Sequence, residues 1–139
     1  MPPLVPLQDL WVLLVEDEPV VAELLTLVLE EAGVKVITAS SGSEALKALD
    51  AFVPNLFISD IHSKDTDGWS LLARVRALEA EWGMHRVPAI AVTGDDVSLL
   101  GLECKDQGRA VEFQRYLLKP VEIQDFIDVV AELGCSHKF

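Results

Sequence analysis

Five residues that can do chemistry together stand at the ends of apolar runs in this chain. Glu16 and Asp17 follow the first run, and Asp60 follows a later one. Thr93 follows another run, and Lys119 closes the last. Crowded carboxylates repel one another and raise one another's pKa unless a cation lies among them. Oxygen ligands without cysteine or an imidazole cluster favour a hard ion, so these residues predict a site for Mg²⁺ or Mn²⁺.

The same residue types also suit phosphoryl transfer. A carboxylate can act as a nucleophile and form an aspartyl phosphate. A metal ion and a lysine ammonium then neutralise the charge on the equatorial oxygens of the transition state. Each residue alone has a simpler explanation, because acids and threonines after strands often cap helices and a single lysine is usually solvated. Their joint occurrence at successive strand ends favours a functional site.

The segments that position these residues alternate between short apolar runs and longer amphipathic ones. The predicted strands cover residues 11–15, 34–38, 56–59, 88–92 and 113–118. The predicted helices cover residues 19–33, 41–49, 69–81, 94–108 and 122–133. Five strands interleaved with five helices predict an α/β fold with a doubly wound parallel sheet. Ligands bind at the carboxyl ends of the strands in such a sheet, which is where the polar residues fall.

Local signals mark the ends of the first two predicted helices. Pro19 suits the first turn of a helix, and Gly33 suits the position after its last residue. The sequence of residues 41–44, Ser-Gly-Ser-Glu, has the spacing of a capping box. In the first helix several apolar residues recur with helical spacing. They are Val20, Leu24, Leu27, Val28 and Leu29.

The composition of the chain predicts one soluble domain without a general affinity for polyanions. The 139 residues are the length of one domain, and a formal net charge of -12 argues against binding to nucleic acid or anionic membranes. The sequence has no recognisable targeting segment and no apolar run near the ~18 residues of a membrane span, so we expect a cytoplasmic protein. Cys104 and Cys135 have no metal-ligand spacing and are expected to be free thiols.

The sequence resembles the receiver domain of two-component response regulators, and more closely a single-domain regulator of the chemotaxis type. The resemblance covers about residues 10–133 and rests on four motifs in their order and spacing. These are Val15-Glu16-Asp17-Glu18, Asp60 with Asp67-Gly68, Ala91-Val92-Thr93-Gly94, and Tyr116-Leu117-Leu118-Lys119-Pro120. The resemblance implies a single receiver domain over residues 1–139, with a flavodoxin-like five-stranded parallel sheet of order 2-1-3-4-5 and five helices.

The resemblance also implies a role for each polar residue at the strand ends. Asp60 corresponds to the phosphoacceptor, which takes a phosphoryl group from a sensor histidine kinase or a histidine phosphotransfer protein. Asp17 corresponds to a direct Mg²⁺ ligand, Glu16 to a ligand that acts mainly through water, and the backbone carbonyl of His62 to a further ligand. Lys119 corresponds to the residue that pairs with the phosphoryl group, and members of the family commonly have a cis peptide bond between this lysine and the following proline.

A switch is implied by the same resemblance. The hydroxyl of Thr93 is expected to move onto the phosphoryl group, and Tyr116 to turn inward into the space that is vacated. The change alters the surface of the fourth helix, fifth strand and fifth helix, where an output partner of unknown identity binds. Without the family spacing, a tyrosine in an edge strand is more simply explained by packing.

Two segments depart from the family pattern. Residues 61–66 read Ile-His-Ser-Lys-Asp-Thr where the family has a Met-Pro-rich loop, so Lys64 replaces a turn-fixing proline. Residues 94–112, which include the predicted fourth helix, are a few residues longer than the corresponding family segment. Both segments border the expected site or output surface, so the effect of these departures on phosphoryl lifetime and partner choice stays open.

Three other functional classes compete with the receiver interpretation. An aspartyl-phosphate phosphatase of the haloacid dehalogenase type needs an acid two residues after the nucleophile, where this chain has His62. A nucleotide-binding enzyme is disfavoured because neither GxGxxG nor GxxxxGK[ST] occurs. A pseudo-receiver, which acts as an interaction module without phosphorylation, remains the alternative. We therefore predict a signalling protein that catalyses its own phosphorylation and dephosphorylation and processes no external metabolite.

Overall fold

A computed structural model describes residues 7–61, 68–94 and 113–134 of the chain. Within them, one parallel sheet has its strands in the order β2-β1-β3-β4-β5. The strands are β1 (Trp11–Val15), β2 (Lys35–Ala39), β3 (Leu56–Asp60), β4 (Ala89–Thr93) and β5 (Arg115–Leu118). The order and the parallel pairing confirm the predicted flavodoxin-like sheet.

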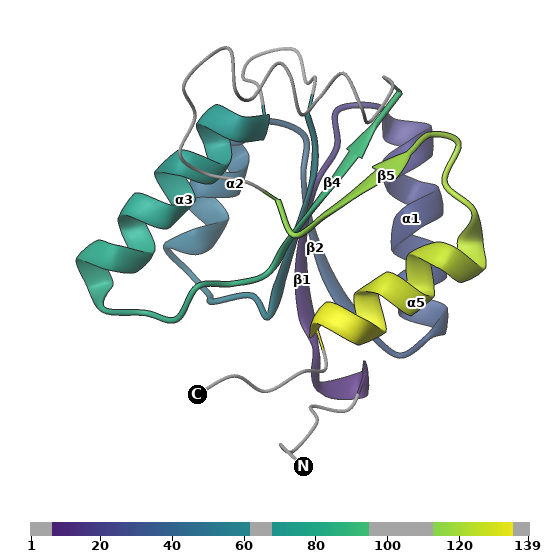
Figure 1. Ribbon diagram of the computed structural model, residues 1–139, viewed down its shortest axis with the longest axis horizontal. Helices are drawn as coiled ribbons and strands as arrows, with labels where there is room; N and C mark the ends of the chain where they lie inside the picture. The colour runs from purple at the N-terminus through teal and green to yellow at the C-terminus, as the bar shows by residue number, and fades with distance from the viewer. Residues whose placement is uncertain (1–6, 62–67, 95–112, 135–139) are drawn as a thin grey trace.

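Four α-helices and one short 3-10 helix accompany the sheet in the described residues. The 3-10 helix covers Leu7–Asp9, and the α-helices are α1 (Pro19–Glu31), α2 (Gly42–Leu49), α3 (Gly68–Trp82) and α5 (Ile123–Gly134). Helices α2 and α3 cover one face of the sheet, and α1 and α5 cover the other (Figure 1). The predicted helix over residues 94–108 lies outside the described residues apart from its first position. A bilayer crossing requires a longer and more apolar helix than any in the described ranges.

Two apolar cores lie on the two faces of the sheet. Strands β3 and β4 are buried over their whole length, as expected for apolar strands that helices cover on both sides. Phe57 and Trp69 belong to the core beneath α2 and α3, whereas Leu29 and Phe126 belong to the core beneath α1 and α5. Because close-packed cores deform little, the ends of the central strands keep a fixed spacing.

The predicted ends of the first two helices agree with the structure. Pro19 is the first residue of α1, and Gly33 follows that helix with a φ angle of 94°, a conformation that glycine adopts without strain. At the start of α2 the Ser41 hydroxyl accepts a hydrogen bond from the Glu44 backbone N–H at 3.2 Å. The Glu44 carboxylate accepts the Ser40 backbone N–H at 3.3 Å. The capping box is therefore present, with Ser40 as the residue whose N–H the glutamate satisfies.

Helix α1 buries only part of its apolar surface. The buried residues are Leu25 and Leu29, whereas Val20, Leu24 and Leu27 have exposed fractions of 79%, 51% and 55%. Apolar side chains occur on most sides of this helix, so spacing alone does not decide which side packs on the sheet. The predicted helix is confirmed, and tertiary packing selects its buried side.

Candidate functional site

Acidic side chains from two neighbouring strands meet at the carboxyl end of the sheet. Val15 of β1 pairs with Ser59 of β3, so the next residues, Glu16 and Asp60, lie side by side. Oxygen atoms from the carboxylates of Glu16, Asp17 and Asp60 all lie within 4.8 Å of one another. The prediction that acids from separate strand ends converge is confirmed.

Burial makes this acidic cluster electrostatically costly. Glu16 is 3% exposed and Asp60 is 7% exposed, while Asp17 is half-buried. Burial raises the pKa of Glu16, and the charge of Asp60 adds to this effect. Hydrogen bonds from Lys119 and from the Glu18 backbone N–H, the latter at 3.2 Å, lower the pKa of Glu16 without cancelling the increase. The cluster therefore favours either a proton or a cation among its oxygens.

Lys119 reaches into the cluster from the residue after β5. Its ammonium Nζ lies 2.9 Å from Glu16 Oε1 and 3.3 Å from Asp60 Oδ2. Its backbone N–H donates to the carbonyl of Thr93 at 2.7 Å, which holds the end of β5 against the end of β4. Burial alone lowers the pKa of Lys119, but the contacts with Glu16 and Asp60 outweigh it and raise the pKa above 10.5. The Lys119–Pro120 peptide bond is cis, as the family resemblance implied.

Among the described residues, negative charge exceeds positive charge in this cluster. Three carboxylates lie near one ammonium, which contacts Glu16 and Asp60, so these four groups carry a formal charge of minus two (one positive and three negative). A divalent cation would neutralise this excess. The side-chain donors are all carboxylate oxygens, which are the ligands that Mg²⁺ and Mn²⁺ prefer. The donor set therefore fits the hard divalent ion predicted from the sequence.

Thr93 and Tyr116 lie on neighbouring strands beside this cluster. Thr93 is the last residue of β4 and is fully buried, and Tyr116 pairs with Ala91 in the register of β4 and β5. Ala91 and Thr93 are two residues apart and therefore point to the same face of the sheet. Tyr116 is half-buried in the core on that face, and its ring centroid lies 5.9 Å from that of Phe113 in an edge-to-face contact.

Gly68, the first residue of α3, contacts Ile61, the residue that follows the phosphoacceptor candidate. Its backbone N–H donates to the Ile61 carbonyl at 2.7 Å, and the Ile61 N–H donates to the Val92 carbonyl at 3.2 Å. A Cβ atom on Gly68 would lie 2.9 Å from the Ile61 Cα, closer than real side chains approach backbone. Glycine is therefore required by this close approach. From the sequence Gly68 was identifiable only as a motif position, because its contact with Ile61 leaves no trace in local spacing.

Several predicted features lie outside the described residues. His62, whose backbone carbonyl was expected to ligate the metal, is one of them. The rest of the altered loop, residues 63–66, and all of the long 94–112 segment except Gly94 lie outside them too. Cys104 and Cys135 also fall in these parts of the chain. The predictions for these residues stay predictions.

Known sequences and structures resemble this chain over most of its length. The chain is 32% identical over 126 residues to a 14.6 kDa protein in the sodA1 3' region of Leptolyngbya boryana, covering 91% of each chain. It is 28% identical to the probable transcriptional regulatory protein TcrX of Mycobacterium tuberculosis, covering 86% of this chain and 47% of TcrX. It matches only 7% of the peroxide stress-activated histidine kinase mak1 of Schizosaccharomyces pombe. The chain thus spans less than half the length of two of these relatives.

Solved structures agree with the sheet order and the helix placement. A response regulator receiver protein from Pseudomonas putida superimposes with a TM-score of 0.72 at 27% identity, covering 88% of this chain and 95% of the other. The chemotaxis protein CheY4 of Vibrio cholerae has a TM-score of 0.75 at 22% identity over 89% of this chain and 98% of its own, which supports the fold alone. The family model for the response regulator receiver domain matches residues 12–131. The chain therefore belongs to the response regulator receiver domain family.

Proposed function

We propose that this chain receives a phosphoryl group on Asp60 from the phosphohistidine of a sensor histidine kinase or a histidine phosphotransfer protein. The observation that carries the proposal is that oxygens of the Asp60, Glu16 and Asp17 carboxylates lie within 4.8 Å of one another, with the Lys119 ammonium 3.3 Å from Asp60. Such an arrangement suits a group that gains negative charge and needs cations beside it. Membership of the receiver family supports phosphorylation on an aspartate.

In the proposed transfer an Asp60 carboxylate oxygen attacks the phosphorus atom of the donor. A new O–P bond forms, the N–P bond of the phosphohistidine breaks, and the imidazole leaves with the electron pair. Glu16, Asp17 and the backbone carbonyl of His62 are proposed to hold Mg²⁺ or Mn²⁺ with Asp60. When bound, this ion supplies positive charge to the phosphoryl oxygens. Lys119 holds its ammonium beside Asp60, and its raised pKa keeps it protonated at neutral pH.

Thr93 and Tyr116 are proposed to report the phosphorylation to the surface. Their positions on adjacent strands and on one face of the sheet support a coupled movement. The hydrogen bond from the Lys119 N–H to the Thr93 carbonyl links the strand ends that bear the two residues. In this proposal the Thr93 hydroxyl turns toward the phosphoryl oxygen, Tyr116 turns inward, and the surface of β5 and α5 changes for an output partner not yet identified.

The exposed apolar residues of α1 support a docking side for the phosphodonor. Val20, Leu24 and Leu27 follow one another at intervals of four and three residues, so they form one stripe on the helix. Pro19, at the start of the helix, lies only two residues after Asp17. A donor that covers the stripe with apolar side chains therefore lies next to the acidic cluster. We propose this face as the surface on which the phosphohistidine protein binds.

The proposed organisation is a single receiver domain over residues 1–139 with its core at about residues 10–133. We propose that it acts in the cytoplasm, where its donor is a kinase or phosphotransfer protein. It processes no external metabolite and speeds only its own phosphorylation and dephosphorylation. The alternative is a pseudo-receiver, which binds partners without phosphorylation, and the altered 61–66 loop is the observation that favours it.

The proposal is tested with acetyl phosphate as a small phosphodonor. The full chain, incubated with acetyl phosphate and Mg²⁺, is expected to form an acid-stable and base-labile phosphoryl adduct that mass spectrometry detects. Asp60→Asn removes the nucleophile and is expected to abolish the adduct. Asp50→Asn, which changes an exposed aspartate at the end of α2, is the matched control and is expected to leave it unchanged.

Two other results would contradict this proposal. If the wild-type chain forms no adduct and does not bind beryllofluoride, the pseudo-receiver alternative is correct. If the chain hydrolyses an external phosphomonoester, and Asp60→Asn abolishes that turnover, the protein is a phosphatase.

A further inference from the structure

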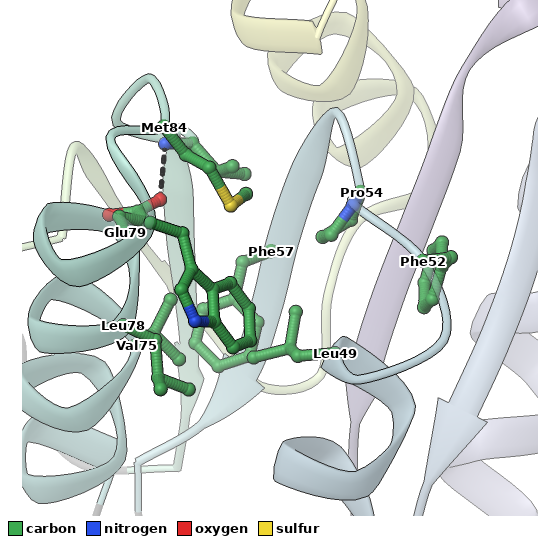
Figure 2. Close-up of a pocket in the computed structure, with 10 residues that line it drawn as sticks. Leu49, Phe52, Pro54, Phe57, Val75, Leu78, Glu79 and Met84 are labelled. Carbon is green, nitrogen blue, oxygen red and sulfur yellow. Dashed lines mark hydrogen bonds between the residues drawn. The ribbon is translucent and has the colours of Figure 1, made fainter.

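An apolar pocket opens between the ends of α2 and α3, at the end of the sheet away from Asp60. It is lined by side chains from both helices, from β3 and from the segment after α3, among them Leu49, Phe57, Val75 and Leu78 (Figure 2). Its volume is about 20 Å³, enough for a methyl-sized group. Trp82 also lines the pocket and is 46% exposed. The pocket therefore offers an apolar cavity next to an exposed indole.

A hydrogen-bond network shapes this pocket before anything binds. Glu79 lines the pocket, but its carboxylate is held by Arg76 Nη1 at 2.8 Å and by the Val87 N–H at 2.7 Å. Arg76 Nη1 also donates to the Val87 carbonyl at 2.7 Å, and the Met84 N–H donates to the Glu79 carbonyl at 2.8 Å. The segment after α3 is thus fixed against the helix. A preformed pocket loses less entropy on binding than a mobile one.

A second hollow continues from the pocket along the groove between α2 and α3. The two share Leu78, and the hollow has a volume of about 360 Å³. Lys47 on α2 and Arg74 on α3 line it and are both exposed, and Asp50 is the acid beside them. Two cations against one carboxylate give the hollow a positive charge in a chain whose net charge is -12. We call the pocket and the hollow together the α2–α3 groove.

The charges of the helices differ between the two faces of the sheet. Helices α1 and α5 together carry six acids and no cation. Helices α2 and α3 carry three acids and three cations. One of these cations, Arg76, is buried in its pair with Glu79, so Lys47 and Arg74 are the exposed helical cations of the described residues. The exposed helical cations thus lie beside the α2–α3 groove, where they complement an acidic ligand.

We propose that the α2–α3 groove binds an acidic amphipathic helix of a partner protein. An apolar side chain of that helix enters the pocket beside Trp82, and a neighbouring apolar side chain packs on Leu78. The carboxylates of the partner helix pair with Lys47 and Arg74. The groove lies beside the amino ends of β3 and β4, whereas Asp60 lies at the carboxyl end of β3. Binding therefore leaves the phosphorylation site open, and the interaction does not depend on the function proposed above.

The probes are two labelled model peptides of about 18 residues, long enough to form a helix in water. Both place leucines along one helical stripe among alanines, and their charged positions are glutamate in one peptide and lysine in the other. If net charge alone decided binding, the strongly acidic chain would bind the lysine peptide more tightly. If the groove binds as proposed, the glutamate peptide binds the full chain more tightly, as measured by fluorescence anisotropy.

The decisive variant is Lys47→Glu with Arg74→Glu, which is expected to weaken binding of the glutamate peptide by about tenfold. Its matched control is Lys35→Glu with Arg115→Glu, which makes the same change in net charge on the two edge strands. The control is expected to weaken binding much less. Far-UV circular dichroism and the acetyl phosphate adduct on Asp60 show whether the variants remain folded and competent.

A local readout comes from the tryptophan side chains. In ¹H–¹⁵N spectra the indole N–H signal of Trp82, assigned with Trp82→Phe, is expected to shift on binding the glutamate peptide, whereas the signal of the buried Trp69 is not. Tighter binding of the lysine peptide, or equal weakening by both double variants, would overturn the proposal. Sedimentation that reveals a dimer of the chain, abolished by Lys47→Glu with Arg74→Glu, would overturn it too, because the groove is then filled by a second copy.

Discussion

The two ends of the sheet handle buried charge in opposite ways. At the carboxyl end, the Lys119 ammonium contacts Glu16 and Asp60, Asp17 lies beside them, and the described residues leave negative charge in excess. At the other end, Arg76 pairs with Glu79 at 2.8 Å, and both side chains are buried. One cation therefore pairs with one anion. The Val87 carbonyl accepts a hydrogen bond from Arg76, and the Val87 N–H donates one to the Glu79 carboxylate.

The difference separates a structural ion pair from a functional cluster. A buried pair with balanced charge and hydrogen-bonded partners needs nothing from outside, and its role is to hold the segment after α3 in place. A buried cluster with excess charge has an unfavourable electrostatic free energy, which the rest of the fold must offset. Binding a cation stabilises such a cluster. Charge balance, rather than burial or the number of charged residues, therefore distinguishes the two ends.

The largest loss of stability is expected when the balanced pair of Arg76 and Glu79 is broken. Arg76→Met leaves the Glu79 carboxylate buried without its cation, and we expect the free energy of unfolding to fall by about 3–5 kcal/mol. Urea denaturation measures the change. Arg74→Met, two residues along the same helix but exposed, is the control and is expected to change stability by less than about 0.5 kcal/mol. Equal losses in the two variants would contradict a structural role for the pair.

A smaller loss of stability is expected when Lys119, the cation that the described residues bring to this cluster, is replaced. Lys119→Met increases the repulsion among the carboxylates, and in a chelator it is expected to cost about 1–2 kcal/mol after allowance for solvent screening. Mg²⁺ is expected to reduce this loss, because the added ion replaces the missing positive charge. Thermal unfolding with and without Mg²⁺ measures both values. A loss that stays the same in Mg²⁺ would argue against a cation site at these carboxylates.

The free energy of unfolding is expected to rise when an acid is removed from the same cluster. Asp60→Asn lowers the excess negative charge, while Lys119 keeps its contact with Glu16 at 2.9 Å. In the absence of divalent ions we expect the variant to be more stable than wild type by about 1 kcal/mol, because functional sites often reduce stability. Calorimetry measures this difference, and Asp50→Asn at the exposed end of α2 is the control. Destabilisation by Asp60→Asn would mean that the cluster is balanced after all.

The residues of the unbalanced cluster were predictable from the sequence because they depend on topology. Glu16, Asp60 and Thr93 each stand at a strand end, and the carboxyl ends of parallel strands meet at one edge. The Arg76–Glu79 pair was not predicted, since it depends on the backbone of Val87, which reaches the helix only through the tertiary fold.

Two other features of the fold escaped prediction for the same kind of reason. The buried side of α1 is selected by packing, because Leu24 and Leu25 are equally apolar and only the second faces the core. The need for glycine at residue 68 comes from its close approach to the backbone of Ile61. The periodicity of apolar residues predicts helices and strands, and the positions of strand ends predict which side chains converge. Neither pattern predicts contacts between segments that are far apart in the chain.

The smallest effect on stability is expected at Glu44, an exposed carboxylate whose pKa is shifted in the opposite direction from that of Glu16. Glu44 accepts hydrogen bonds from the side chain and the backbone N–H of Ser40, and these lower its pKa below 4.5. The pKa of Glu16 is instead raised by burial. A lowered pKa means that the charged form stabilises the fold above about pH 4.5 and that this contribution is lost as the pH falls through the lowered value.

Glu44→Gln is therefore expected to make the loss of stability on acidification shallower below about pH 4.5, because glutamine has no proton to take up. Urea denaturation at a series of pH values between about 6 and 3 measures the slope. Glu23→Gln, which removes an exposed carboxylate from α1, is the control and is expected to leave the slope nearer to that of wild type. Identical slopes in the two variants would show that the Ser40 contacts do not favour the charged form. The contrast between the glutamates would then rest on burial at Glu16 alone.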